Sequence, residues 1–154
     1  MALKLPTKTV VSVSHAAKSD SSPTALDADT DSLNEKIREF ERALVERRFA
    51  VSARVQIDYH EPTGVRTELE FGKWADGWRL LVVDSVERTD AASNLSENKD
   101  ILFNASRDVR LEATQHFLEL TRALVRAVEF ERQRVAKAVN ATNEAIAFVK
   151  GLPR

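Results

Sequence analysis

The chain has 154 residues, a net charge of −1 at neutral pH and no cysteine. The lack of cysteine excludes disulfides and thiolate metal sites, and it fits a reducing, cytoplasmic setting. The near-balanced charge argues against a dedicated nucleic-acid binder, and no apolar run approaches the roughly 18 residues that a membrane span requires. We therefore expect one domain with an additional segment, without a membrane span.

The N-terminal third divides into a tail and a helix. Residues 1–30 are rich in Ser, Thr, Asp and Lys and show no lasting period, which predicts a flexible tail. Ser32 followed by Glu35 forms a capping box, which is typical of a helix start. Apolar residues then recur at helical spacing as far as Leu44, and the predicted helix ends near Arg47-Arg48.

Three strands are predicted next. Apolar and polar residues alternate from Val51 to His60 and again from Val65 to Phe71, and the segment Glu61–Gly64 between them is a turn. The dipeptide Asp76-Gly77 predicts a tight hairpin into a third strand, Trp78 to Val86.

The third strand is apolar on both faces, because Leu81 and Val83 alternate with Leu80 and Val82. Strands of this kind are usually covered on both sides. The polar stretch from Arg88 to Phe103 is predicted to be a loop whose last three residues dock into the core. The fold class is therefore α+β: an N-terminal helix, a three-stranded antiparallel meander and a long C-terminal helix.

The long helix is the most informative segment. Residues 106–149 contain no Gly and no Pro, and Asn104 or Ser106 can cap the start. About 40 residues of helix would reach about 60 Å, whereas a domain of this size is only about 30 Å across. The helix must therefore break, extend beyond the domain, or pack against another chain.

Apolar residues of this helix follow a heptad pattern. The a positions are Leu111, Leu118, Val125, Arg132, Val139 and Ile146, and the d positions are Thr114, Thr121, Val128, Val135, Thr142 and Val149. The stripe is broad up to residue 131 and narrow beyond it, which favours a domain over 31–131 and an association segment over 132–154. Two alternatives remain open: a break near 140–143 that folds the end back, and an unpaired extension.

No residue pattern predicts catalysis, a cofactor or a metal. His60, Glu68 and Glu70 are expected on the face of the predicted sheet opposite the core, without diagnostic spacing, and Asp27, Asp29 and Asp31 resemble only the start of a calcium loop. Phosphate-binding glycine loops and nucleophile elbows are absent from the sequence. Solvated polar faces explain these residues, and an enzyme of unrecognised type remains an alternative.

The order helix, three strands, helix resembles that of the double-stranded-RNA-binding domains. That resemblance implies a β1–β2 loop in the minor groove and a basic helix start on phosphates. The matching helix start here carries Arg107 and Arg110 with Asp108 between them, and Arg122 and Arg126 follow along the helix. Because residues 51–90 hold five cations and eight anions, nucleic-acid binding is the second hypothesis.

The preferred hypothesis is a non-enzymatic, self-associating module that binds protein. Large apolar surface without internal cover usually marks an interface. The predicted partner or oligomer contacts are Leu81, Val83, Val128, Val135, Val139, Ile146 and Val149.

Overall fold

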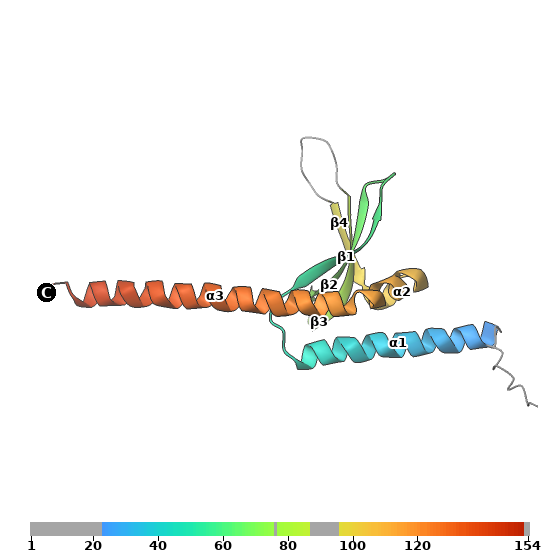
Figure 1. Cartoon of the computed structure of the whole chain (residues 1–154), viewed down its shortest axis with the longest axis horizontal. Coiled ribbons are helices and arrows are strands. Elements are labelled where there is room, and N and C mark those ends of the chain that lie inside the picture. The colour runs from blue at the N-terminus through green and yellow to red at the C-terminus, as the bar shows by residue number, and fades with distance from the viewer. Residues whose placement is uncertain (1–22, 76, 87–95, 153–154) are drawn as a thin grey trace, which may run out of the picture.

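The computed structural model describes residues 23–75, 77–86 and 96–152, and it confirms the α+β class. Helices and strands follow one another without a crossover, and the last helix is by far the longest (Figure 1). The elements are α1 (Pro23–Glu46), β1 (Ala53–His60), β2 (Val65–Trp74), β3 (Gly77–Val86), β4 (Ser96–Ile101), a 3-10 turn (Leu102–Asn104), α2 (Arg107–Gln115) and α3 (Phe117–Lys150).

Helix α1 begins at Pro23, nine residues before the predicted start, so the Ser32–Glu35 pair lies inside the helix. Proline suits a first helical turn because its missing N–H would have no partner there. Residues 23–30 are therefore helical and are not part of a tail, whereas the rest of the predicted tail, 1–22, lies outside the described residues.

The sheet has four antiparallel strands in the order β1-β2-β3-β4, so the prediction of three strands is wrong by one. Strand β4 reads Ser-Glu-Asn-Lys-Asp-Ile and contains a single apolar residue, which is why no strand pattern marked it. Charged residues are common on edge strands because they discourage pairing with other chains. The predicted docking after this segment is confirmed at Leu102, which is fully buried.

Both predicted turns are present, with one shift in position. The turn at Glu61–Gly64 is confirmed, and Gly64 adopts φ 63°, which glycine tolerates without strain. In the β2–β3 hairpin, Trp74 pairs with Gly77, so Gly77 belongs to the strand, and Asp76 lies outside the described residues.

A bulge interrupts β1 between Gln56 and Asp58. Bulges shift the alternation of side chains by one residue. Asp58 therefore pairs with Thr67 and Tyr59 with Arg66, so Tyr59 leaves the apolar face to which its spacing assigned it.

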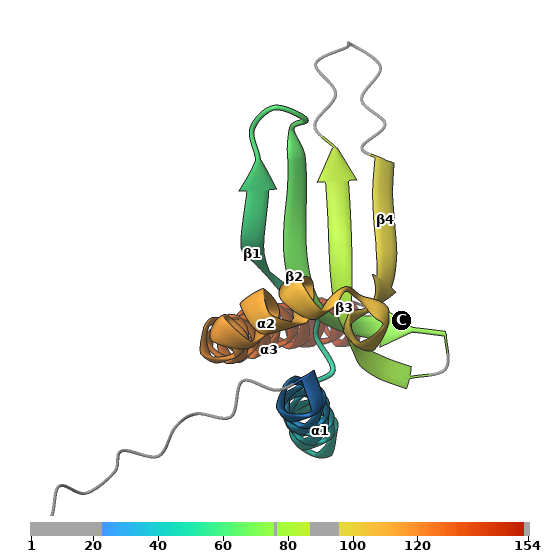
Figure 2. The same ribbon diagram turned by 90° about the vertical axis from the view of Figure 1, so that its right-hand side faces the viewer.

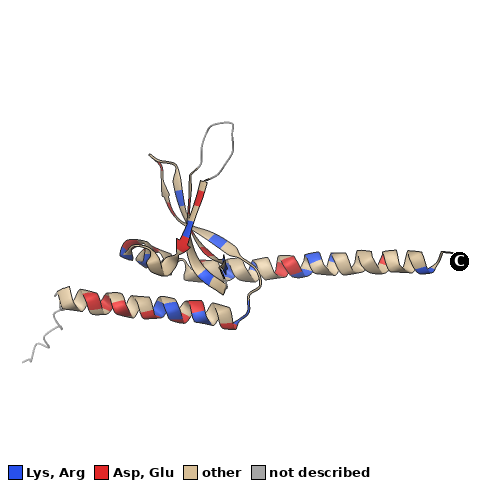
Figure 3. Cartoon of the chain, turned by 180° about the vertical axis from the view of Figure 1, so that it is seen from behind, with Lys and Arg blue, Asp and Glu red and all other residues tan. Residues whose placement is uncertain are grey.

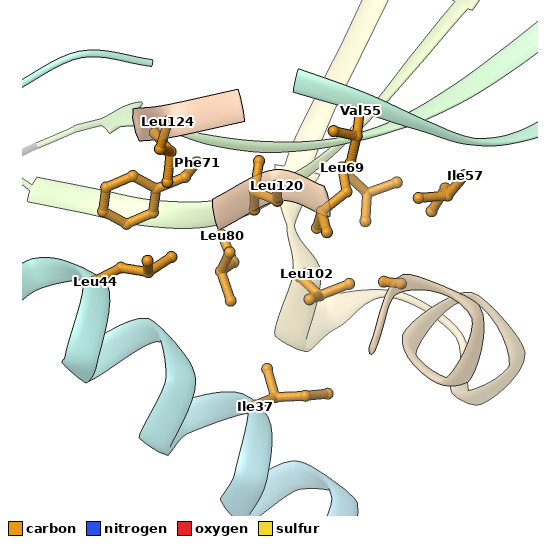
Figure 4. Packing of buried hydrophobic residues seen from close by; sticks show 12 residues of the cluster. Ile37, Leu44, Val55, Ile57, Leu69, Phe71, Leu80, Leu102, Leu120 and Leu124 are labelled. Atoms are coloured by element: carbon orange, nitrogen blue, oxygen red, sulfur yellow. The ribbon is translucent and has the colours of Figure 1, made fainter. Parts of the chain in front are cut away.

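The core lies between one face of the sheet and the three helices (Figures 2 and 4). Ile37 and Leu44 of α1 and Leu120 and Leu124 of α3 pack against a cluster of sheet residues that includes Phe71. Further sheet members of this cluster are Val55, Ile57, Leu69, Leu80 and Val82.

A carboxylate fixes α1 to the sheet. Glu41 accepts a hydrogen bond from the backbone N–H of Leu80 at 2.9 Å and another from the Arg79 guanidinium at 2.9 Å. Leu80 lies on β3 beyond the end of β4, where its N–H has no strand partner on that side. The contact satisfies a backbone donor that the short edge strand leaves free.

The long helix is interrupted at His116, not near 140–143. Ser106 caps α2 by accepting from the N–H of Val109, which confirms one of the two predicted caps. At His116 the backbone turns to φ −99° and ψ 3°, and its N–H donates to the Ala113 carbonyl three residues back. Helix α3 then continues unbroken to Lys150, so the fold-back alternative is wrong.

Candidate functional site

The outer half of α3 extends beyond the other helices and strands that the structure describes. With 34 residues, the helix is about 50 Å long at about 1.5 Å per residue. Figure 1 shows it passing beneath the sheet and continuing to its C-terminal end with no described element beside it. Every residue from 132 to 152 is exposed. Of the three alternatives for this helix, the described residues of the single chain thus show an extension that none of them covers.

The apolar face that packs on the sheet continues along this extension. At 100° per residue, four exposed apolar residues larger than alanine lie within about 60° of Leu124 around the helix axis in the outer part of α3. We call them the distal face: Val135, Val139, Ile146 and Val149, which are 59%, 52%, 47% and 65% exposed. A helix that is apolar along one face is stable in water when another surface covers that face.

A hollow of about 500 Å³ opens where α3 leaves the sheet. We call it the root groove, and its walls are the α1–β1 connection and the first turns of the extension. Its lining residues are Arg48, Ala50, Val51, Val128, Glu131, Arg132, Val135 and Ala136. Two of the lining residues, Val128 and Val135, were predicted contacts. Val128 is half-buried next to the core and Val135 belongs to the distal face, so the groove lies between the two. The lining residues from the α1–β1 connection, Arg48, Ala50 and Val51, were not predicted as contacts, because an irregular segment between two elements has no periodic pattern.

Charged residues are concentrated at the base of the extension (Figure 3). Arg132 pairs with Glu129 at 3.4 Å, and Arg134 pairs with Glu131 at 2.6 Å, with all four side chains largely exposed. Farther out, the remaining charges up to residue 152 are Lys137, Glu144 and Lys150. The outer part of α3 is therefore mostly uncharged.

The predicted contacts Leu81 and Val83 are not available to a partner. Their exposed fractions are 1% and 0%, although they lie on the face of the sheet opposite the helices. By register they share that face with Glu70 of β2 and Lys99 of β4. The cover that the two-sided apolar pattern required is thus supplied by the chain itself.

A charged network forms this cover. Arg54 on β1 donates to Glu70 at 2.7 Å and to Glu97 on β4 at 2.8 Å, and Lys99 donates to Glu70 at 3.1 Å. Because β2 and β3 lie between β1 and β4, the Arg54–Glu97 bond crosses above them. The hydrogen bond from Arg54 lowers the pKa of Glu97, and the bond to Glu97 raises the pKa of Arg54.

The four arginines of the nucleic-acid hypothesis do not form one cluster of free cations. Arg110 donates to the carbonyls of Phe103 and Ala105, so it holds the start of α2 in place. Arg107 is half-buried on α2. Arg122 and Arg126 are exposed one turn apart on α3 and form no ion pair within the part of the chain that the structure describes.

The candidate metal ligands are engaged in ordinary contacts. His60 hydrogen-bonds to Thr63 in the β1–β2 turn, while Glu68 and Glu70 face Arg54. Past the β1 bulge His60 pairs with Val65, so it lies on the opposite face of the sheet from Glu68 and Glu70, and the prediction that the three share a face is wrong. Asp27, Asp29 and Asp31 lie along α1. Across residues 23–75, 77–86 and 96–152, no three His, Asp or Glu side chains come close enough together to hold a metal ion.

No protein-family model matches the chain, and no curated protein or solved structure shows significant similarity to it. Among the helices that the structure describes, none has the length and apolar character needed to cross a membrane. The distal face and the root groove are therefore the candidate site, and their geometry alone carries the functional argument.

Proposed function

We propose that this protein is a non-enzymatic, self-associating module that binds protein through the distal face of α3. One observation carries the proposal: the helix face that is buried at Leu120 and Leu124 continues through Val135, Val139 and Ile146, which are 59%, 52% and 47% exposed. Four exposed aliphatic side chains lie on one face of the extension, and exposed apolar side chains gathered on one face usually mark an interface. The root groove extends that surface onto the body of the protein.

The nucleic-acid alternative has weaker support. Arg122 and Arg126 are exposed and have no ion pair with any residue that the structure describes, but Arg110 is engaged by backbone carbonyls and Asp108 lies two residues from it in the sequence. Phosphate binding by several cations would weaken steeply as salt rises, whereas apolar association would not. A salt titration of any complex therefore separates the two functions.

Light scattering on the purified full chain tests self-association. We expect the wild type to show a mass above that of the monomer, rising with concentration in the micromolar range. Val139→Asp places a carboxylate in the middle of the distal face, where association would bury it without a partner. This variant should remain monomeric while its circular dichroism stays helical.

The matched control is Phe148→Asp. Phe148 is 71% exposed on the same helix but lies about 120° away from Leu124 around the axis. The Phe148→Asp substitution removes a larger apolar side chain than Val139→Asp does, yet it should leave the mass measured by light scattering the same as that of the wild type. A wild-type chain that stays monomeric at every concentration contradicts the proposal, as does a Phe148→Asp variant that dissociates as fully as Val139→Asp.

A further inference from the structure

We infer that the partner on the distal face is a second copy of this chain, aligned antiparallel, with the end of each α3 seated in the root groove of the other. This inference rests on the proposed function and names its partner and geometry. Three features of the chain favour this arrangement: the charges beside the distal face, the order of its side chains, and the length of the extension relative to the groove.

The charges disfavour a parallel pair. Arg132 occupies an a position of the heptad pattern, and it is 76% exposed in the single chain. In a parallel pair in register, a positions face each other, so Arg132 would meet the partner's Arg132 inside the seam. Like charges brought together in a seam are strongly unfavourable.

The charges favour an antiparallel pair. In an antiparallel pair, each a residue of one helix packs beside a d residue of the other. The e positions, which directly follow the d positions, face the e positions of the partner helix at the edge of the seam. Glu129 and Lys150 are both such residues, at opposite ends of the extension. In the register that brings them together, Glu129 of each chain approaches the partner's Lys150, which gives two symmetric ion pairs.

The same register gives matched apolar layers. It places Val135 against the partner's Ile146 and Val139 against the partner's Thr142, each pair occurring twice by symmetry. Arg132 then lies beside the partner's Val149, where its long side chain can reach solvent. Ala138 faces the partner's Ala145, and small residues there allow the helices to approach closely. A two-fold pair of this kind is closed and does not propagate into fibres.

The length of the extension matches the position of the groove. The symmetry point of this register lies between residues 140 and 141. Val149 of one chain therefore reaches the level of the partner's Arg132, and Leu152 reaches the level of the partner's Glu129. The root groove lies at that level and is lined by Arg132, Val135 and Val51. The incoming helix thus ends where the body of the partner begins, and its exposed Val149 and Leu152 cover the apolar part of the groove.

Disulfide cross-linking tests this geometry without background, because the chain contains no cysteine. Two single variants, Val135→Cys and Ile146→Cys, are purified reduced, then oxidised alone and as an equimolar mixture. In the antiparallel register residue 135 lies near the partner's 146 but about 16 Å from the partner's 135, too far for a disulfide. We expect covalent dimers in the mixture only. A second mixture, Val51→Cys with Val149→Cys, should cross-link at the groove.

The outcomes separate this inference from the proposed function. Covalent dimers from either 135 or 146 variant alone would establish a parallel pair and overturn the inference, while self-association would stand. The same holds if light scattering shows a dimer and the 135/146 mixture gives no cross-link, since the register would then be wrong. A 51/149 mixture that stays uncross-linked overturns the seating in the groove. Monomers throughout would contradict the proposed function itself.

Discussion

A single residue, Arg54 of β1, joins three strands of the sheet, because its guanidinium donates to Glu70 on β2 and to Glu97 on β4. Its alternating position correctly predicted a polar face, but nothing in the spacing showed that it would reach Glu97, 43 residues away. That contact depends on the order in which the four strands pair and on a strand, β4, that lacks an apolar pattern. The two-sided apolar β3 correctly predicted cover on both faces, but not that charged side chains of the same chain would provide it. Gly72 leaves room for this network, since a Cβ there would overlap the Glu70 carboxylate.

The network makes the stability of the protein depend on pH in a defined direction. The hydrogen bond from Arg54 lowers the pKa of Glu97 in the folded chain. The stabilisation is therefore complete above the ordinary glutamate pKa and is lost as the pH falls through the lowered value. We expect Glu97→Gln to reduce the free energy of unfolding by up to about 1 kcal/mol at pH 7, because the pair is partly exposed.

Urea unfolding of both proteins from pH 7 to pH 2.5 measures this difference. The wild type and Glu97→Gln should converge at the acid end, where the carboxyl is protonated in either state. Glu144→Gln is the control, because Glu144 is exposed and forms no ion pair among the described residues. A gap between wild type and Glu97→Gln that stays constant down to pH 2.5 would show that the network does not act through this carboxylate.

Among the elements, strong periodicity was easiest to interpret. Spacing predicted α1, the first three strands and the long helix, because each buries a regular apolar face. The start of α1 was missed, since residues 23–30 carry too few apolar side chains to show a period. The break at His116 was also missed, because it falls between good helix formers and rests on backbone geometry. Asn140 and Asn143, which favoured a break, are exposed within α3, where their modest preference against helix is tolerated.

Two charged residues of α3, Glu129 and Lys150, allow a test of how the helices pair. Glu129→Lys would bring each new lysine near the partner's Lys150 and replace two attractive contacts by two repulsive ones. We expect the two changed contacts together to weaken the free energy of association by about 1.4 kcal/mol at low salt, which raises the dissociation constant of the dimer about tenfold. Lys150→Glu should have a similar effect. The double variant Glu129→Lys/Lys150→Glu reverses both pairs and should restore association.

Sedimentation equilibrium at 50 mM and 500 mM salt measures these constants. The differences should shrink at high salt, because exposed charges are screened. Glu129 also pairs with Arg132 within its own helix, and the double variant loses that contact as well. Restoration would therefore come from the contact between chains. A double variant weaker than both single variants would contradict the antiparallel register.

At the scale of the whole molecule, the sequence correctly predicted a helix too long for its domain. The helix outgrows the sheet because its first turns carry a broad apolar face for the core and its last turns only a narrow one. Sequence could not place the groove, since Val51 and Val128 are distant in the chain and meet only after the sheet has formed. The body and the extension thus differ physically: the core lies before residue 125, and residues 132–152 bury nothing in the single chain.

This division predicts how a chain ending at Glu131 would behave. It retains every buried residue of the core, so its body should fold, with an unfolding temperature within a few degrees of that of the dilute wild type. Association stabilises the folded state by mass action, so the unfolding temperature of the wild type should rise with protein concentration. That of the shortened chain should not. Circular dichroism melts from 1 to 100 μM measure both. If the shortened chain is unfolded at every concentration, the extension supports the body directly, and the separation of a folding domain from an association segment fails.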